Sequence, residues 1–442
     1  MIERERAKTV IKLALPIIGA MISTNLLTLV DTYMVSFLGE TSLAAVGISG
    51  FASNLVLALV AGFSVGVQAI TARRLGEGRE DVLCLPLNGG LFLSLVVGGP
   101  ITLLAWFLVP YFLPILVADP AVQAVGVPYM RYIVLCTVAV GLSCSFQGYW
   151  NGRGKPMYYM ITLIITHIIN VILNYALIFG NLGFPEMGVT GAAIASFSSL
   201  CLGVLIYFGF TLYKARGQSF LAGLPSRETL AGLLKLGLPS SIQRTLFWLG
   251  YTVFFWVVAH VGTTELAIGN VLVRLTLIII LPGMGMGLAS ATLVGQALGR
   301  GEPEDAQRWA WDVLKIGGII GVILGLPLMI FPEAVLGFFH LNSPETLAVG
   351  RAATRLVGLT TPLFVCNFIF MHSLLGAGAA KRVMITSITC QWALFLPAVY
   401  LVGIVLGKGL FLIWVVQAFY GLILGFAYGI QWQMGSWKSI KL

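Results

Sequence analysis

The sequence has 442 residues, of which 58% are hydrophobic and only 10% are charged. Soluble domains carry about a quarter charged residues, so this composition excludes an ordinary soluble protein and indicates a polytopic membrane protein. The formal net charge of +9 does not indicate a nucleic-acid partner, because the basic residues lie in short loops between apolar segments and not on one continuous face.

Twelve apolar segments are each long enough to cross a bilayer, which takes about 20 helical residues. In chain order, the predicted spans are 11–38, 43–72, 85–114, 122–150, 157–180, 188–213, 231–260, 266–297, 310–333, 346–375, 383–406 and 410–434. The basic flank before the first span shows no small-residue cleavage site, so we expect it to lead into helix 1 and not to be a signal peptide. The sequence therefore predicts an all-α membrane fold.

The charges between these spans alternate. Lys and Arg gather in the amino terminus, in every second loop and in the tail, whereas the intervening loops carry mainly acidic residues. Basic loops stay on the cytoplasmic side of a membrane. We therefore expect both termini in the cytoplasm, which agrees with an even number of spans, and we expect the protein in the cell inner membrane.

An internal repeat divides the chain into two halves. IKLALP at 11–16 matches LKLGLP at 234–239, and LGEG at 75–78 matches LGRG at 298–301. The repeat predicts a six-helix lobe over residues 1–213, a cytoplasmic linker over 214–230 and a second six-helix lobe over 231–442. Two copies inserted in the same direction are related by a pseudo-twofold axis along the membrane normal, an arrangement typical of transporters that work by alternating access.

A single carboxylate interrupts the apolar pattern of the first span. Asp31 is the only one of the 17 acidic residues that we place well inside a span, where a charge costs about 2.5–3.5 kcal/mol on insertion scales. Asn170 and Asn174 share one face of the fifth predicted helix, and Ser196 lies at similar depth on the sixth. We predict a polar cluster of these four residues about 9–15 Å from the outer loops. A purely structural carboxylate, hydrogen-bonded to a neighbouring helix, is the alternative.

Such a cluster suits a small coupling ion. Removal from water favours the protonated carboxylic acid, so Asp31 could take up and release a proton. Na⁺ is the alternative, held by the oxygens of Asp31, Asn170 and Asn174. Pro16 lacks an amide hydrogen and marks a predicted hinge in helix 1. No other metal or cofactor is indicated, because the six cysteines show no CxxC spacing and no histidine cluster.

Several residues are candidates for a substrate cavity. An aromatic side chain can bind a flat organic cation through a cation–π contact, although most aromatic residues in a membrane bundle serve packing. An arginine inside a span is costly and needs a partner or water. The candidate cavity residues are Met34, His167, Phe247, Trp248, Phe254 and Arg274.

The combination of LALP, VDTYMVSFLG, GVQAITARRLGEG, NGRGKP, IINVILNYALIFG and GVTGAAIAS resembles the multidrug and toxic compound extrusion (MATE) transporters, in their DinF-like branch. The resemblance implies two six-helix bundles around a central cavity and antiport of organic cations against H⁺ or Na⁺. It matches Asp31 to the branch's coupling aspartate, Ser196 to its helix 6 hydroxyl, and Asn170 and Asn174 to an Asn and an Asp. Asn174 therefore replaces a carboxylate. The helix 7 acid of the other main branch is missing from SSIQRTLFWLGYTVFF.

The expected function is thus multidrug efflux by a monomeric, non-enzymatic antiporter in contact with membrane lipids. It would export amphipathic, mostly cationic organic compounds, with H⁺ favoured over Na⁺ as the coupling ion. A lipid-linked oligosaccharide flippase of the same superfamily is an alternative, but it would need several basic cavity residues where only Arg244 and Arg274 are candidates. An intramembrane enzyme is the second alternative, and no DDxxD, HExxH or Ser/His pair supports it.

Overall fold

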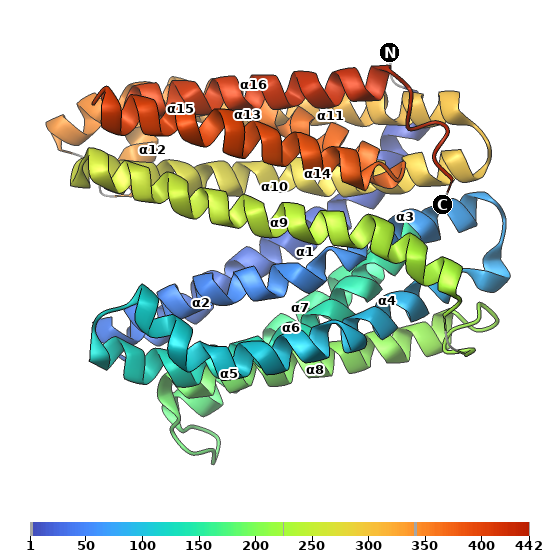
Figure 1. Ribbon diagram of the computed structural model, residues 1–442, viewed down its shortest axis with the longest axis horizontal. Coiled ribbons are helices and arrows are strands. Elements are labelled where there is room, and N and C mark those ends of the chain that lie inside the picture. The colour runs from blue at the N-terminus through green and yellow to red at the C-terminus, as the bar shows by residue number, and fades with distance from the viewer. Residues whose placement is uncertain (1–2, 224, 340–342, 442) are drawn as a thin grey trace. The chain divides into compact units, whose positions relative to one another are not determined.

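The computed structural model describes residues 3–223, 225–339 and 343–441, and the regular structure within these ranges is helical (Figure 1). The elements are α1 (Arg4–Ser36), α2 (Glu40–Ala61), α3 (Phe63–Gly76), η1 (Glu80–Val82), α4 (Leu85–Val96), α5 (Gly98–Leu116), α6 (Pro120–Gly152), α7 (Pro156–Phe179), α8 (Gly188–Lys214), α9 (Arg227–Val261), α10 (Thr263–Gly299), α11 (Pro303–Ile330), α12 (Pro332–Phe338), α13 (Pro344–Gly376), α14 (Ala380–Ile388), η2 (Thr389–Phe395), α15 (Leu396–Tyr400), η3 (Leu401–Val405) and α16 (Gly409–Gln433). By length and composition, twelve helical stretches in these ranges can cross a membrane, which confirms the predicted number of spans.

Three of the spans consist of more than one element. The second combines α2 and α3, the third combines η1, α4 and α5, and the eleventh runs from α14 to η3. In the eleventh span, Pro397 has no backbone hydrogen to donate to the preceding turn, and the π-helical turns of η2 come directly before it. Wider turns of this kind keep a continuous helical path through the membrane.

Several helices begin earlier than the hydropathy pattern predicted. The first span starts at Arg4 and not at residue 11, and the ninth starts at Pro303 and not at residue 310. The added turns are charged, so an apolar window excludes them although water can solvate them at a membrane surface. One consequence is that Asp312, which the sequence placed near a helix end, lies inside the ninth span.

The helix bounds repeat along the chain in the register that the sequence predicted. α1 begins at Arg4 and α9 at Arg227, an offset of 223 residues. The fourth and tenth spans correspond to α6 and α13, which are both 33 residues long and begin 224 residues apart. Each half of the chain therefore forms six spans in the same order, although individual spans are interrupted at different places.

The chain forms two compact units, and two helices belong to both. One unit contains Gly19–Thr245, and the other contains the amino-terminal residues up to Ile18 together with Leu246–Lys441. α1 thus changes unit after Ile18, and α9 changes unit after Thr245. The predicted lobe boundaries at 213 and 231 stay a prediction.

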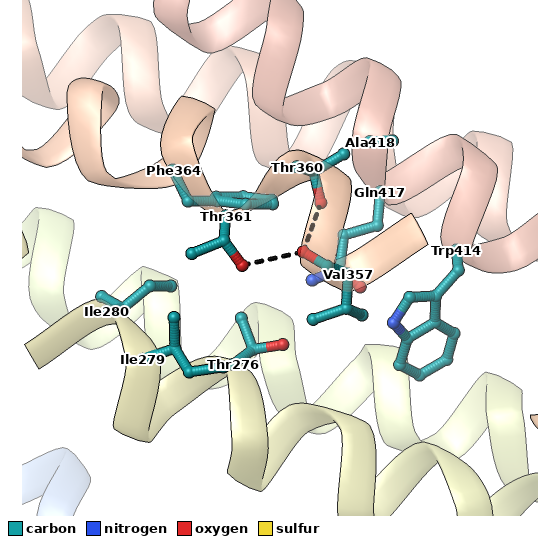
Figure 2. Close-up of a pocket in the computed structure, with 10 residues that line it drawn as sticks. All are labelled: Thr276, Ile279, Ile280, Val357, Thr360, Thr361, Phe364, Trp414, Gln417 and Ala418. Carbon is teal, nitrogen blue, oxygen red and sulfur yellow. Dashed lines mark hydrogen bonds between the residues drawn. The ribbon is translucent and has the colours of Figure 1, made fainter. Parts of the chain in front are cut away.

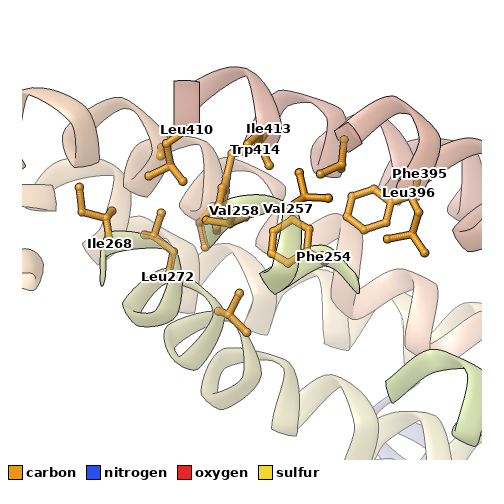
Figure 3. Packing of buried hydrophobic residues seen from close by; sticks show 14 of the residues in the cluster. Phe254, Val257, Val258, Ile268, Leu272, Phe395, Leu396, Leu410, Ile413 and Trp414 are labelled. Carbon is orange, nitrogen blue, oxygen red and sulfur yellow. The ribbon is translucent and has the colours of Figure 1, made fainter. Parts of the chain in front are cut away.

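The unit that contains Leu246–Lys441 has an aromatic core between α9, α10, α15 and α16 (Figure 3). The ring of Phe254 stacks on Phe395 at 5.6 Å and meets Trp414 edge-on at 5.7 Å. Phe254 is only 1% exposed. This core fixes the part of α9 that follows Leu246 in its unit.

The first turns of α1 are anchored in the same unit by a charge cluster. Arg6 Nε donates to Asp312 Oδ2 at 2.6 Å, and Arg6 Nη1 donates to Asp305 Oδ1 at 2.7 Å. The guanidinium also lies 3.7 Å from the centre of the Trp309 ring. Next to this charge cluster, Val10 packs with Met286 and other apolar residues. The amino-terminal end of α1 is therefore bound to α11 by charge and by packing.

In the other unit, close packing of α7 and α8 depends on glycine. A Cβ atom at Gly191 would lie 2.5 Å from the Leu177 carbonyl oxygen. We expect Gly191→Ala to destabilise the protein by about 1–3 kcal/mol, because the two helices would have to separate. Gly209→Ala, on the same helix but with open space around it, should be neutral or stabilising. Thermal unfolding in detergent measures both effects, and equal melting temperatures for the two variants would contradict this account.

Candidate coupling site

The predicted polar cluster forms in the structure from α1, α7 and α8. Asn174 Nδ2 donates to Asp31 Oδ1 at 2.7 Å and to Asn170 Oδ1 at 2.9 Å. Asn170 Nδ2 in turn donates to Ser199 Oγ at 3.1 Å and to Ser196 Oγ at 3.4 Å. The asparagines are buried and Asp31 is half-buried. All four predicted residues therefore belong to one hydrogen-bonded chain.

The hydrogen bonds of this chain diverge from Asn174, which donates to Asp31 on one side and to Asn170 on the other. Each asparagine amide donates both of its hydrogens, so the acceptors at the two ends are the Asp31 carboxylate and the hydroxyls of Ser196 and Ser199. A hydrogen bond from an amide to an ionised carboxylate is stronger than one between neutral groups. Within the described part of the chain, the ion pairs found do not involve Asp31. The arrangement stabilises a charged Asp31 without a permanent counter-ion.

One acceptor in the chain has no donor. The Asn174 Oδ1 atom is buried and, among the described residues, has no hydrogen-bond partner. A protonated Asp31 would present an O–H group that needs an acceptor of this kind. Rotation of the Asn174 amide would bring Oδ1 toward Asp31, so the pair can satisfy either protonation state.

An apolar cluster lies one helical turn beyond Asp31 and Asn174. Met34 and Val35 of α1 pack against Ile178 of α7 and Ala192 of α8. Met34 is 8% exposed, so it is a core residue here, and the expectation that it lines a cavity is corrected. The cluster shields this end of the polar chain from water.

Pro16 lies inside α1, which is one continuous helix from Arg4 to Ser36. The change of compact unit comes two residues later, between Ile18 and Gly19. A proline removes one backbone hydrogen bond of the helix and weakens it locally. The weak point of α1 therefore coincides with the place where the helix passes from one unit to the other.

The remaining cavity candidates are scattered. His167 Nδ1 lies 2.8 Å from Ser23 Oγ of α1, so it links α7 to α1 one turn from Asn170. Phe247 and Trp248 are half-exposed on α9 and contact each other edge-on at 6.0 Å. Arg274 is exposed on α10.

Phe254 does not line an open cavity. It lies inside the aromatic core shown in Figure 3 and is almost fully buried. The helical period does not explain this placement, since Phe254 lies two turns after Phe247 and shares its face of α9. Phe254 is buried because Phe395 and Trp414 pack on it. Phe247 and Trp248 therefore remain the aromatic candidates for contact with a substrate.

Sequence reasoning missed a small polar cavity between α10, α13 and α16 (Figure 2). Its volume is about 10 Å³, which is about the minimum that a cavity of this measure needs to hold one water molecule. Gln417 Oε1 and Trp414 Nε1 are buried and have no hydrogen-bond partner among the described residues. The hydroxyls of Thr360 and Thr361 donate to the Val357 carbonyl. The cavity has the polarity to hold one bridging water.

Sequence reasoning also missed Ser199 and Ser23. Ser199 accepts the shorter of the two hydrogen bonds from Asn170, and Ser23 is the partner of His167. A signal for Ser199 was present, because it lies three residues after Ser196 and shares its helix face. Serines are frequent in membrane helices, so the residue type alone does not distinguish it.

A family model, MatE, matches residues 16–176 and 239–401, two segments that begin 223 residues apart. A probable multidrug resistance protein NorM of Thermotoga maritima is 26% identical over 93% of this chain and 89% of that protein. The multidrug resistance protein PmpM of Pseudomonas aeruginosa is 24% identical over 91% of this chain and 85% of that protein.

A solved structure also matches nearly the whole fold. It is described as the outward-facing conformation of a multidrug resistance MATE family transporter of the MOP superfamily, and it covers 99% of this chain and 97% of its own. The TM-score is 0.89 at 22% sequence identity. The all-α twelve-span fold predicted from the sequence is therefore confirmed, whereas the DinF-like branch stays a prediction.

Proposed function

The chain belongs to the MatE family of membrane transporters, and we propose that it is a multidrug efflux antiporter that exchanges organic compounds for protons. The names of the relatives support drug efflux. The proposed substrates are amphipathic and mostly cationic. The protein works as a monomer in the cell inner membrane, with both termini in the cytoplasm.

The observation that carries the proton-coupling proposal is the contact between Asp31 and Asn174. The ionised carboxylate accepts a hydrogen bond from Asn174 Nδ2 at 2.7 Å, and Asn174 Oδ1 is ready to accept one from the protonated acid. Proton uptake removes a buried charge and reverses this hydrogen bond. The two protonation states therefore favour different packing of α1 against α7.

The position of Asp31 on α1 connects this local change to a larger one. α1 contains Pro16, and the helix passes between compact units just after it. A change in how the Asp31 end of α1 packs on α7 would bend α1 at Pro16. The backbone hydrogen bond that Pro16 lacks lowers the free-energy cost of bending there. We propose that this bending shifts the balance between outward-open and inward-open states.

The amide orientation supports protons over sodium. Asn174 turns its nitrogen toward Asp31, and Asn170 Oδ1 is already occupied by Asn174 Nδ2. Na⁺ is a hard cation that needs several oxygen ligands. A proton needs only one carboxylate oxygen, whereas Na⁺ would also require the Asn174 amide to rotate and give up its hydrogen bond to Asn170. The site as folded therefore suits a proton better.

Transport in proteoliposomes tests this function. The purified protein is reconstituted, and accumulation of a fluorescent organic cation such as ethidium is followed with an imposed pH gradient, an imposed Na⁺ gradient or neither. We expect a pH gradient to drive accumulation against the dye gradient and a Na⁺ gradient at constant pH to have no effect. Accumulation driven only by Na⁺ would refute proton coupling, and no accumulation of any organic cation would refute drug efflux.

Asn174→Asp places a second carboxylate beside Asp31. Two adjacent carboxylates attract a cation more strongly than one, and the substitution replaces the amide nitrogen that faces Asp31 with an oxygen. We expect this variant to gain Na⁺-driven dye accumulation, with a rate at least severalfold above that of the wild type under a Na⁺ gradient. The isosteric control is Asn174→Leu, which should gain no Na⁺ response. Equal responses in both variants would show that the second carboxylate is irrelevant.

A further inference from the structure

An apolar groove lies between α6 and α8, away from the polar chain. Leu135, Val138 and Leu142 of α6 line one side, and Phe197 and Leu205 of α8 line the other. Its volume is about 420 Å³. A cavity needs only about 10–15 Å³ of this measure to hold one water molecule, so the groove has room for a segment of a hydrocarbon chain.

The groove lies beside a helix surface with the character of a lipid contact. A Cβ atom added at Gly98, at the start of α5, would lie 3.6 Å from Val138 Cγ2, so Val138 also lies next to α5. The residues that follow on α5 include exposed Leu103, Leu104 and Phe107. Large apolar side chains exposed at membrane depth contact lipid chains. An acyl chain is therefore the hydrocarbon most available to this groove.

A cationic group lies one helical turn from the groove. Arg131 precedes Leu135 by four residues, so the two share a face of α6. Helical side chains lean toward the amino-terminal end, which directs the guanidinium away from the groove and toward the end of α6 at Pro120. Its Nε atom is buried and has no hydrogen-bond partner among the described residues.

Aromatic side chains accompany this arginine. The guanidinium of Arg131 lies 5.5 Å from the centre of the Trp106 ring, and Tyr132 meets Trp106 edge-on at 6.1 Å. Trp and Tyr concentrate at the level of lipid headgroups. The guanidinium is thus set among side chains typical of the membrane interface.

The depth of Arg131 in the membrane places its side chain within reach of the lipid headgroups. α6 has 33 residues and is about 50 Å long, so each end extends about 10 Å beyond a hydrocarbon core of about 30 Å. Arg131 lies about 16 Å from the end at Pro120, which is about 6 Å inside the core boundary. An arginine side chain can reach across that distance to the headgroups.

We infer that Arg131 and the α6–α8 groove form a binding site for a phospholipid of the outer leaflet. The phosphate accepts hydrogen bonds from the guanidinium, and one acyl chain lies along the groove toward the membrane centre. The Arg131 guanidinium recognises the phosphate of the headgroup, because its planar N–H groups match the positions of phosphate oxygens. The leaflet follows from the cytoplasmic orientation of the termini proposed above.

Native mass spectrometry of the full-length protein in detergent tests this inference. Phosphatidylglycerol and diacylglycerol with identical acyl chains are titrated separately onto the wild type, Arg131→Gln, Leu135→Trp and the control Arg355→Gln. Arg355 is the repeat counterpart of Arg131 and is exposed. We expect Arg131→Gln to weaken phosphatidylglycerol binding about fivefold, the effect of one interfacial basic residue, and to leave diacylglycerol binding unchanged.

The groove half of the site is tested by Leu135→Trp, which should weaken binding of both lipids because the larger ring occupies the space of the acyl chain. Arg355→Gln should leave both lipids bound as in the wild type. Unchanged phosphatidylglycerol binding in Arg131→Gln would overturn the site. So would an equal loss in Arg355→Gln, because it would assign the effect to overall charge.

Discussion

Replacing Asp31 with asparagine is expected to reduce pH-driven accumulation of an organic cation in proteoliposomes to the level of protein-free vesicles. Asparagine keeps the size of the side chain and can still hydrogen-bond with Asn174, but it cannot bind or release a proton. The variant should therefore still equilibrate its substrate across the membrane without concentrating it. Dye accumulation with and without a pH gradient, on equal amounts of reconstituted protein, measures the difference.

Two controls make this result specific. Asp81→Asn removes an exposed acidic side chain from the unit that also contains Asp31. This variant should transport like the wild type. Thermal unfolding should show that Asp31→Asn is folded, with a stability equal to or above that of the wild type, since a charge has been removed from a half-buried position. Undiminished accumulation by folded Asp31→Asn would mean that another group couples transport.

Replacing Arg6 with glutamine is expected to destabilise the protein by about 2–3 kcal/mol. The substitution removes the cation that Asp305 and Asp312 share, so among the described residues Asp305 keeps only the ion pair with Arg300 and Asp312 only that with Lys315, at 3.8 Å. Removing one partner of a mostly buried pair costs more than the pair contributes. The side chains of Arg6 and Asp312 are only 17% and 12% exposed. Thermal unfolding in detergent at low and high salt measures the loss, which should persist in salt.

The control for this prediction is Arg79→Gln, which breaks the ion pair with Glu77. Those two side chains are 57% and 32% exposed, so the change should cost less than about 0.5 kcal/mol. In a protein that already carries Asp305→Asn and Asp312→Asn, Arg6→Gln should have little further effect, because the two carboxylates that Arg6 pairs with are gone. An equal loss in that background would assign the destabilisation to the contact between Arg6 and Trp309.

Features set by local pattern could be predicted from the sequence. The number of spans follows from hydropathy, and the repeat follows from self-comparison, because both depend on residues close together in the chain. The depth of Asp31, Asn174 and Ser196 could be counted from the helix ends. Depth does not fix which way a side chain faces, so their meeting in one hydrogen-bonded chain required the structure.

Features that depend on distant segments could not be predicted. Arg6 and Asp312 are 306 residues apart, and nothing in the sequence pattern pairs them. The apolar window placed Asp312 near a helix end, so the sequence did not predict that it lies inside the ninth span and pairs with Arg6. The burial of Phe254 and Met34 was also missed, because an apolar residue in a membrane helix can face lipid, a cavity or the core with the same local pattern.

The most direct test of the central claim is to count the protons released when a substrate binds. An organic cation is added to the detergent-solubilised protein in weak buffer, and the proton release is followed with a pH indicator at a pH where wild-type Asp31 is protonated before binding. The account predicts release of about one proton per wild-type molecule and none from Asp31→Asn. Equal release from the two proteins would contradict it.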